Sequence, residues 1–463
     1  MIPLTLSQVA QAVAGRLVDV PDPTVQVTGS VEFDSRKIGP GGLFVALRGE
    51  RADGHDFASD AIAAGAVGVL AARPVGVPAV VVEDPLRGLG LLARGVADRL
   101  DATVVGVTGS SGKTSTKDLI AQLVRRLGPT VAPPGTFNNE LGFPYTVLRA
   151  DADTRYLVLE YSARGIGHIS YLCEVTPPRI GVVLNVGVAH LGEFGSRDGI
   201  ATAKGELVEA LPDAADGGVA ILNADDPKVA AMAERTAARV LRYGESADAD
   251  VRAEDVSLDE RGRPSFRLVT PEGSASVQLQ LFGAHQVSNT LAAAAVALTC
   301  GVPLADLAVG LGELRPVSER RMDVFETAAG VTVIDDSYNA NPASMAAALR
   351  SLAAIGHRRR CWAVLGYMAE LGEYERAGHE EVGRLAAQLG VDRLVVVEES
   401  AAPIIDGARH QPDWGGEAVQ VADQQAAIEA LRAGLRSGDV VLVKGSRYRT
   451  WKVADWLRGE ANA

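Results

Sequence analysis

A glycine-rich segment between a predicted strand and a predicted helix constrains this chain more than any other feature. The segment reads VVGVTGSSGKTSTKDL, residues 104–119. The β-branched run at its start is typical of a buried parallel strand, and the apolar spacing over residues 113–127 is helical. Backbone N–H groups at a helix N-terminus bind anions, Lys113 adds positive charge, and the Thr114 hydroxyl can ligate Mg²⁺. This order of elements predicts a nucleotide-binding α/β domain.

The segment differs from the usual phosphate-binding pattern G-x-x-x-x-G-K-[ST]. Val107 stands where that pattern has its first glycine, and glycines occur at 106, 109 and 112 instead. A chance Gly-Lys-Thr in an ordinary turn is the alternative interpretation, but strand, loop and helix follow in the required order. We therefore expect the loop to bind phosphate. The residues expected to contact it are Gly109, Ser110, Ser111, Gly112, Lys113 and Thr114.

Length and composition set the scale of the fold. The chain has 463 residues, 47% of them hydrophobic, which is enough for roughly three domains with real cores. Its net charge of −13 argues against a nucleic-acid partner, and its three widely spaced cysteines fit a reducing compartment. The N-terminus lacks a signal-peptide pattern, and no apolar run approaches membrane-spanning length. We expect a cytoplasmic monomer without a membrane span.

Strand and helix patterns divide the chain into three predicted α/β domains. Residues 1–100 hold short alternating elements, residues 101–315 follow the glycine loop with further parallel-type strands, and residues 316–463 form a second doubly wound unit. Polar–apolar alternation on both sides of residues 271–274 predicts an antiparallel hairpin. The predicted fold is a central P-loop-type, mononucleotide-binding parallel sheet with added antiparallel strands. An N-terminal α/β domain and a C-terminal Rossmann-like domain flank it.

Three residues of the central domain are candidates for metal binding or catalysis. Glu160 ends the strand RYLVLE and would face the glycine loop if the two strands are neighbours, where it could hold Mg²⁺. The alternative is an acid that merely ends a strand. His190 follows another buried-type strand, although a lone histidine is more often structural. Lys204 lies in a predicted helix, where lysine is normally solvated.

Amide side chains mark two further candidate contacts in the central domain. Asn138 and Asn139 lie in a Gly/Pro-bounded loop, where they suit either a polar ligand or a turn. Asn289 lies in the first turn of an alanine-rich helix, and from that exposed start it could contact a base or a ribose.

A dense polar loop and several cations mark the last domain. Residues 333–345 follow a buried strand and hold more acids and amides than a turn needs, which favours a ligand site. Arg320 and Arg321 stand near the junction of the second and third domains and could reach a transferred phosphate when the domains close. Lys444 ends a predicted strand near the end of the chain and could supply another positive charge to a cleft between the domains. The polar residues of the loop are Asp335, Asp336, Ser337, Asn339 and Asn341.

Taken together, these motifs resemble the Mur ligases of peptidoglycan precursor synthesis. The resemblance covers nearly the whole chain, and residues 34–57 are similar to the family's UDP-binding first domain. The family's loop, G-x-T-G-[ST]-x-G-K-[ST], accounts for the shifted glycines. The DDSYNANP motif is most similar to the branch that adds D-alanyl-D-alanine, and no Asp-Asn-Pro-Arg signature of the preceding branch is present. The shared motifs are GVTGSSGKTSTK, NNELGFP, NVGVAHLGEFGS, AKGE, GAHQVSN and DDSYNANPASM.

The resemblance implies a reaction, its cofactors and its partners. A carboxylate of UDP-N-acetylmuramoyl-tripeptide would attack the γ-phosphate of ATP, and the amine of D-alanyl-D-alanine would displace phosphate from the acyl phosphate. Thr114 and Glu160 would hold one Mg²⁺ and His190 would help to hold a second. Lys204 would be carbamylated by CO₂, which turns a cation into an anion suited to Mg²⁺.

The resemblance also assigns contacts to the nucleotides and substrates. Arg321, which matches the family's arginine better than Arg320 does, would reach the γ-phosphate. Asn289 would lie near adenine and Asp336 near the ribose or phosphates. Substrate contacts would come from Ser35 and Arg36 on the uridine nucleotide, and from Asn138, Asn139, Asn339, Asn341 and Lys444.

Some positions depart from the family's pattern. Tyr161 and Ser162 replace a usual Met-Gly, Tyr367 replaces a common acid, and residues 450–452 lack a frequent Met-Glu pair. These departures leave open a ligase with a different amine or acceptor, or a paralogue that binds without catalysis. A motor or kinase is disfavoured by the shifted loop and the order of the motifs.

Overall fold

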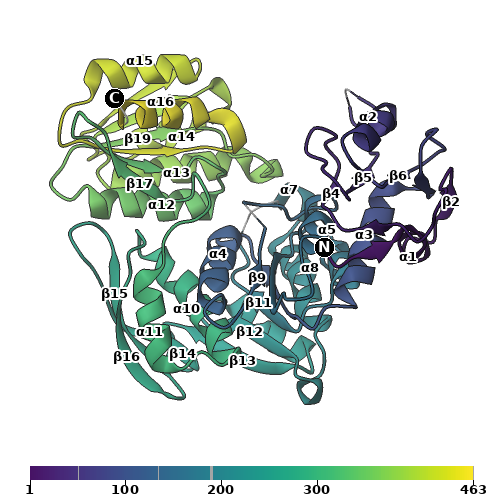
Figure 1. The fold of residues 1–463 in the computed structure, drawn as a ribbon. Helices are drawn as coiled ribbons and strands as arrows, with labels where there is room; N and C mark the ends of the chain where they lie inside the picture. The colour runs from purple at the N-terminus through teal and green to yellow at the C-terminus, as the bar shows by residue number, and fades with distance from the viewer. Residues whose placement is uncertain (51, 134, 188–190, 462–463) are drawn as a thin grey trace.

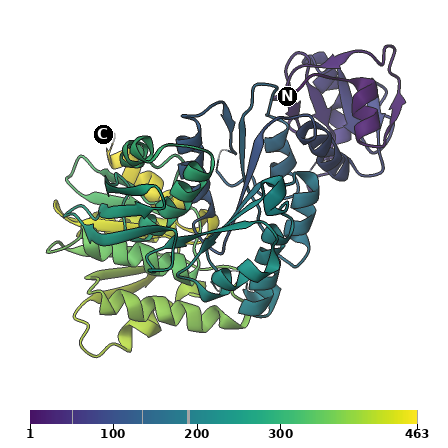
Figure 2. The ribbon, with the colours of Figure 1, turned by 90° about the horizontal axis from the view of Figure 1, so that it is seen from below.

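Successive α/β regions follow one another along the chain, each with its own sheet (Figure 1). The structure is a computed structural model that describes residues 1–50, 52–133, 135–187 and 191–461. The N-terminal region lies at one end of the molecule and the C-terminal region packs beside the central one (Figure 2). Within the described ranges, no helix is both long and apolar enough to cross a membrane.

The N-terminal sheet is parallel except for one edge strand, and its strand order is β2-β7-β6-β5-β4. Helix α3 buries its apolar face against the central region, so the two regions share one hydrophobic core. The elements are β1 (Leu4–Thr5), α1 (Leu6–Ala12), β2 (Arg16–Val18), β3 (Gln26–Val27), β4 (Val31–Glu32), β5 (Leu43–Val45), α2 (Ala58–Ala63), β6 (Gly68–Ala71), β7 (Ala79–Val81) and α3 (Pro85–Ala97).

The central sheet has the strand order β16-β15-β14-β13-β12-β11-β8-β10-β9. The pairings among β8 to β14 are parallel, whereas β14–β15 and β15–β16 are antiparallel. The β15–β16 hairpin is the one that the alternating pattern predicted. The strands are β8 (Thr103–Thr108), β9 (Thr130–Val131), β10 (Tyr156–Glu160), β11 (Ile180–Val183), β12 (Val219–Asn223), β13 (Arg239–Gly244), β14 (Val251–Leu258), β15 (Pro264–Thr270) and β16 (Gly273–Gln278).

Helices cover both faces of the central sheet. In β10, Leu157 and Leu159 belong to one core and Val158 to the other, because successive side chains of a strand point to opposite faces. Helix α4 begins at Lys113 as predicted but ends at Val124 rather than at residue 127. The helices are α4 (Lys113–Val124), α5 (Gly142–Val147), α6 (His168–Val175), α7 (Leu191–Phe194), α8 (Arg197–Glu209), α9 (Pro227–Ala230), α10 (His285–Thr299) and α11 (Leu304–Glu313).

The C-terminal sheet has the order β17-β18-β22-β19-β20-β21, parallel except for edge strand β17. Separate cores lie on its two faces, as in a doubly wound fold. The elements are β17 (Asp323–Glu326), β18 (Thr332–Asp335), α12 (Pro342–Ile355), β19 (Cys361–Leu365), α13 (Glu375–Gln388), β20 (Arg393–Val397), α14 (Pro403–Arg409), β21 (Glu417–Val421), α15 (Gln424–Gly434), β22 (Val440–Lys444) and α16 (Trp451–Ala461).

The central sheet changes winding direction at β8, whose carboxyl end carries the glycine loop. The chain leaves β8 for β9 and β10 on one side and later crosses to β11 on the other. Ligands of open α/β sheets bind at such a switch point. Glu160 pairs in register with Val107, so the end of β10 lies beside the end of β8. The two strands are therefore neighbours, which was the condition for Glu160 to face the glycine loop.

Candidate functional site

A cavity of about 620 Å³ lies between the central and C-terminal regions. Its central wall is built from the glycine loop, the 136–140 loop, the end of β10 and the start of α10. Its opposite wall comes from the polar loop after β18, residues 369–370 beyond β19, and the end of β22. The predicted residues that line it are Ser110, Ser111, Gly112, Lys113, Thr114, Asn138, Asn139, Glu160, Asn289, Arg321, Asp336, Asn339, Asn341 and Lys444.

Hydrogen bonds to the segment that follows β11 fix the conformation of the glycine loop. The Ser111 N–H donates to Asn185 Oδ1 at 3.0 Å, and the Ser110 hydroxyl accepts from the Gly187 N–H at 2.9 Å. Gly112 is left-handed, with φ of +82°, and α4 starts directly after it. The Lys113 ammonium donates to the Gly109 carbonyl at 2.7 Å. The loop thus presents a helix N-terminus and a lysine to the cavity, an arrangement suited to phosphate.

Burial lowers the pKa of Lys113, an effect that Glu160 opposes and Arg321 reinforces. Three charged groups from different elements therefore act on one another across this part of the cavity. A bound polyanion between Lys113 and Arg321 would offset the repulsion between the two cations, so the site is electrostatically matched to a nucleotide polyphosphate.

Glu160 is a buried carboxylate with spare hydrogen-bonding capacity. Its side chain lines the cavity although the residue is 1% exposed. Oε2 accepts a hydrogen bond from Asn138 Nδ2 at 3.1 Å, whereas Oε1 has no partner among the described residues. A buried acceptor without a donor is costly in a folded protein unless a ligand completes it. The donor set therefore fits Mg²⁺, which prefers carboxylate, hydroxyl and phosphate oxygens, and Thr114 lies on the same wall.

Lys204 is buried on α8 rather than solvated, and the expectation for an ordinary helical lysine is wrong here. The residue is 4% exposed and does not itself line the cavity. Burial, together with the charge of Lys113, places the pKa of Lys204 well below its usual value. No hydrogen bond or ion pair of its amine to another described residue is present. His190 lies outside the described residues.

The C-terminal wall carries a buried ion pair and an arginine. Lys444 Nζ lies 2.5 Å from Asp336 Oδ2 and donates to the Asn339 carbonyl at 2.9 Å. Burial lowers the pKa of Lys444 and Asp336 opposes the shift. The Arg321 guanidinium lies 4.3 Å from the centre of the Tyr338 ring, and its Nε has no hydrogen-bond partner in the described part of the chain.

Two amides contact the glycine loop and the helix that follows it, and one of them joins the two walls. Asn341 caps α12 through its side-chain oxygen and donates from Nδ2 to the Ser110 carbonyl at 3.4 Å, across the interface between the regions. Asn289 is 8% exposed, and its Oδ1 accepts from the Thr116 hydroxyl at 3.3 Å. The two residues therefore place amide groups on both sides of the glycine loop.

Some predicted residues are not brought to the cavity. Ser35 and Arg36 are in the N-terminal region and do not line it; the Arg36 side chain is 86% exposed and pairs with Asp34. Arg320 does not line the cavity, and its guanidinium lies 4.9 Å from the centre of the Trp451 ring; Arg321 is the arginine that lines it.

The family departures have different structural roles. Tyr161 is a core residue whose hydroxyl donates to the Thr176 carbonyl at 2.5 Å, and its ring packs edge-on against Phe143. Ser162 lines the cavity, whereas Tyr367 stacks on His379 outside it. The replacement of Met by Tyr161 is therefore a packing change rather than a loss of a cavity group.

Sequence reasoning missed a group of residues that also line the cavity. Tyr338 lay inside the DDSYNANP motif and Arg164 lies four residues beyond Glu160, so both had signals in the sequence. Trp451 was noted only as a departure. Among the residues that line the cavity but were not predicted to do so are Thr136, Glu140, Arg164, His168, His285, Tyr338, Glu370, Arg447 and Trp451.

Three regions of the chain match models of Mur ligase domains. The Mur ligase middle domain matches residues 107–297, the Mur ligase glutamate ligase domain matches residues 320–447, and the Mur ligase family catalytic domain matches residues 28–88. Among curated proteins, the chain is 53% identical to the UDP-N-acetylmuramoyl-tripeptide–D-alanyl-D-alanine ligase of Mycobacterium tuberculosis and 38% identical to that of Escherichia coli, over 96% of each chain.

Solved structures of MurF proteins are similar to this chain over nearly its whole length. MurF from Acinetobacter baumannii superposes with a TM-score of 0.88 at 33% identity, covering 98% of this chain and 99% of that one. MurF ligase from Thermotoga maritima in complex with ADP gives a TM-score of 0.81 at 30% identity, covering 94% and 98%.

Proposed function

The chain belongs to the Mur ligase family, and we propose that it uses ATP to join D-alanyl-D-alanine to UDP-N-acetylmuramoyl-tripeptide in peptidoglycan precursor synthesis. Relatives that carry the name of this reaction support the choice of substrates. The observation that carries the proposal is the cavity itself. It has a glycine loop and Glu160 on one wall, with Arg321 and the Asp336–Lys444 pair on the other.

The reaction would proceed in two displacements. A carboxylate oxygen of the tripeptide attacks the γ-phosphorus of ATP, the bond to the β–γ bridging oxygen breaks, and ADP leaves. The amine of D-alanyl-D-alanine then attacks the acyl carbon, and inorganic phosphate departs as the amide forms. Lys113 and the loop N–H groups hold the nucleotide phosphates, and Arg321 meets the transferred phosphoryl group from the opposite wall.

Thr114 and Glu160 are the residues proposed to hold one Mg²⁺, and His190 to help hold a second. The second ion would screen the repulsion between the attacking carboxylate and the phosphate. The unpartnered Oε1 of Glu160 supports this assignment. Asn138 keeps the Glu160 carboxylate oriented through its amide.

Lys204 is proposed to react with CO₂. Its lowered pKa favours the neutral amine, which is the form that adds to CO₂ to give a carbamate and release a proton. The product is an anion in place of a buried amine. Ser35 and Arg36 lie away from the cavity, so they are proposed to bind the uridine nucleotide while the tripeptide extends toward Glu160. A monomeric state and a cytoplasmic location remain predictions.

A product assay tests the proposed function. We expect that UDP-N-acetylmuramoyl-tripeptide, ATP, Mg²⁺ and D-alanyl-D-alanine together yield a pentapeptide, detected by mass spectrometry, and that ADP release requires both organic substrates. Parallel reactions with lysine and diaminopimelate at acceptor position three identify the preferred acceptor. Turnover with single amino acids but not with the dipeptide would overturn the assignment. Nucleotide binding without phosphate release would favour a binding paralogue.

A further inference from the structure

Of the two adjacent arginines that follow the central region, one lines the cavity and the other does not. Arg321 lines the cavity, whereas Arg320 lies against the C-terminal helix α16. The residues on either side of Arg321 both have left-handed backbones, with φ of +57° at Arg320 and +51° at Met322. This conformation is unfavourable for residues with a Cβ and persists only where surrounding contacts hold it. The direction of Arg321 therefore depends on what holds its neighbours.

Arg320 is held by α16. Its Nη2 lies 2.6 Å from Asp455 Oδ1, and its guanidinium lies 4.9 Å from the centre of the Trp451 ring. The Trp451 carbonyl also accepts a hydrogen bond from Arg320 Nη1 at 3.4 Å. Because one side chain contacts both a carboxylate and an aromatic ring on the same helix, its position is well defined.

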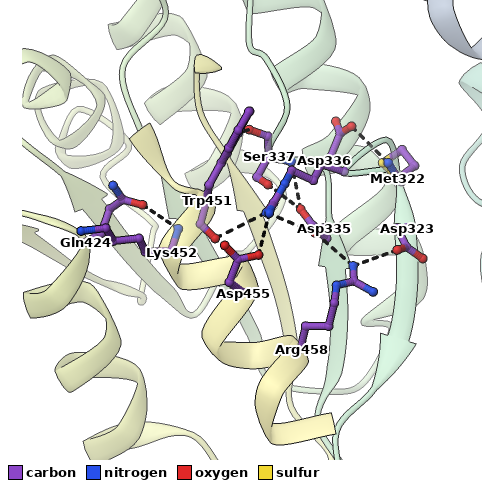
Figure 3. Close-up of polar contacts among 11 residues, drawn as sticks. Met322, Asp323, Asp335, Asp336, Ser337, Gln424, Trp451, Lys452, Asp455 and Arg458 are labelled. Atoms are coloured by element: carbon purple, nitrogen blue, oxygen red, sulfur yellow. Dashed lines mark hydrogen bonds and ion pairs between the residues drawn. The ribbon is translucent and has the colours of Figure 1, made fainter. Parts of the chain in front are cut away.

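The same helix also holds the loop that carries Asp336. Arg458 Nη2 lies 3.1 Å from Asp335 Oδ2, which belongs to a fully buried residue, and 2.8 Å from Asp323 Oδ2. Trp451 donates from its indole nitrogen to the Ser337 carbonyl at 2.8 Å. Figure 3 shows Trp451, Asp455 and Arg458 along α16, facing the segment that bears Asp335 and Ser337. Their spacing of four and three residues places them on one helical face.

A hydrogen bond joins the two segments that α16 holds. The Met322 N–H donates to Asp336 Oδ1 at 3.1 Å. Asp336 uses its other oxygen for Lys444. The arginine segment and the polar loop therefore meet at the cavity, and both contact the same face of α16.

We propose that this face of α16, formed by Trp451, Asp455 and Arg458, is a clamp that positions Arg321 and Asp336 for the nucleotide, with Asp455 as a positioning residue. The inference rests on the proposed function. Within the described part of the chain, Asp455 pairs with Arg320, which does not line the cavity, so its effect on Arg321 would be indirect. It is well suited to a test because its side chain is 56% exposed, so replacing it leaves no cavity in a core.

Asp455→Ala is the first variant, and Lys452→Ala is its matched control because Lys452 is exposed on the same helix. We expect Asp455→Ala to lower kcat/KM for ATP by about tenfold, since small displacements of a phosphate-binding group are costly. The KM for D-alanyl-D-alanine and the melting temperature should remain near those of the unchanged protein. A fall in melting temperature with unchanged kinetics for ATP would show a purely structural role and overturn the clamp.

A double-mutant cycle then asks whether Asp455 acts through Arg321. If it does, Asp455→Ala should have little further effect once Arg321→Ala has removed the positioned group. An equal loss in both backgrounds would overturn the proposal. The same four proteins are then compared by calorimetry for their affinity for a non-hydrolysable ATP analogue, with no other substrate present. If the unchanged protein makes no pentapeptide but the cycle in analogue affinity is non-additive, the proposed function fails and the clamp stands.

Discussion

Asn289 Oδ1 lies 2.7 Å from the point that a Cβ on Gly112 would occupy. The amide fills the space that the glycine leaves, and Gly112 also has a left-handed backbone, with φ of +82°. The start of α4 and the start of α10 can therefore approach each other behind the phosphate loop. Both the contact and the backbone angle require glycine at this position.

Gly112→Ala should weaken ATP binding by at least about tenfold, because a left-handed alanine and a steric clash would displace the loop. Calorimetric titration with ATP measures the effect. Gly415→Ala is the control, since a Cβ there meets no atom within 4 Å. Equal ATP affinity in the two variants would contradict the geometry of the loop.

Glu160→Gln should lower turnover by about 100-fold at limiting Mg²⁺. It should leave the melting temperature of the nucleotide-free protein unchanged or higher, because it removes a buried charge that the described residues only half satisfy. Activity is measured against Mg²⁺ concentration, and melting by scanning calorimetry. Glu174→Gln, an exposed acid on α6, serves as the control. Unchanged dependence on Mg²⁺ would remove Glu160 from the metal site.

Lys204→Ala should lose most activity and keep its fold, whereas Lys228→Ala should lose little because Lys228 pairs with Asp198 near the surface. In ¹³C-bicarbonate the unchanged protein should show a carbamate carbon signal that is missing from Lys204→Ala. Full activity of the unchanged protein in CO₂-depleted buffer, with no such signal, would show that the lysine is not carbamylated.

His285 should make the protein sensitive to mild acid. Burial lowers the pKa of His285 from 6.5 to about 4, with Asp336 opposing the shift and Lys444 adding to it. The folded state therefore disfavours the protonated ring. Its contribution to stability is complete above about pH 6.5 and is lost as the pH falls toward 4.

Chemical unfolding at pH 7 and pH 5 measures this effect. The free energy of unfolding should fall further for the unchanged protein than for His285→Phe, which has no group to protonate. His410→Phe, at an exposed position, should behave like the unchanged protein. If His285→Phe loses as much stability on acidification, the histidine is not the group responsible.

Residues whose position follows from local pattern could be predicted from the sequence. Glu160 was found because it ends a buried strand next to the strand that carries the glycine loop, and the register of β10 with β8 places it there. The strand–loop–helix order likewise located Lys113, and the polar density after β18 located Asp336. In each case the position of the residue at the end of a strand, or directly after it, indicated where the site lies.

Features that depend on how distant elements pack could not be read in this way. The helix pattern around Lys204 gives no sign that the amine is buried, because its cover comes from tertiary packing. The different positions of Arg320 and Arg321 relative to the cavity depend on left-handed backbone angles that residues without special propensity adopt. Trp451 enters the cavity from the far end of the chain, where the sequence offered only a departure from a family pattern.

The contact between Asn341 and the Ser110 carbonyl has a consequence for inhibition. At 3.4 Å it is one long hydrogen bond between the central and C-terminal regions. A compound that bound between Asn341 and Ser110 would keep the central and C-terminal regions apart. It would inhibit turnover without resembling ATP or a muramyl peptide. Because a nucleotide that contacts both walls would favour joined regions and such a compound would favour separated ones, each should weaken the binding of the other.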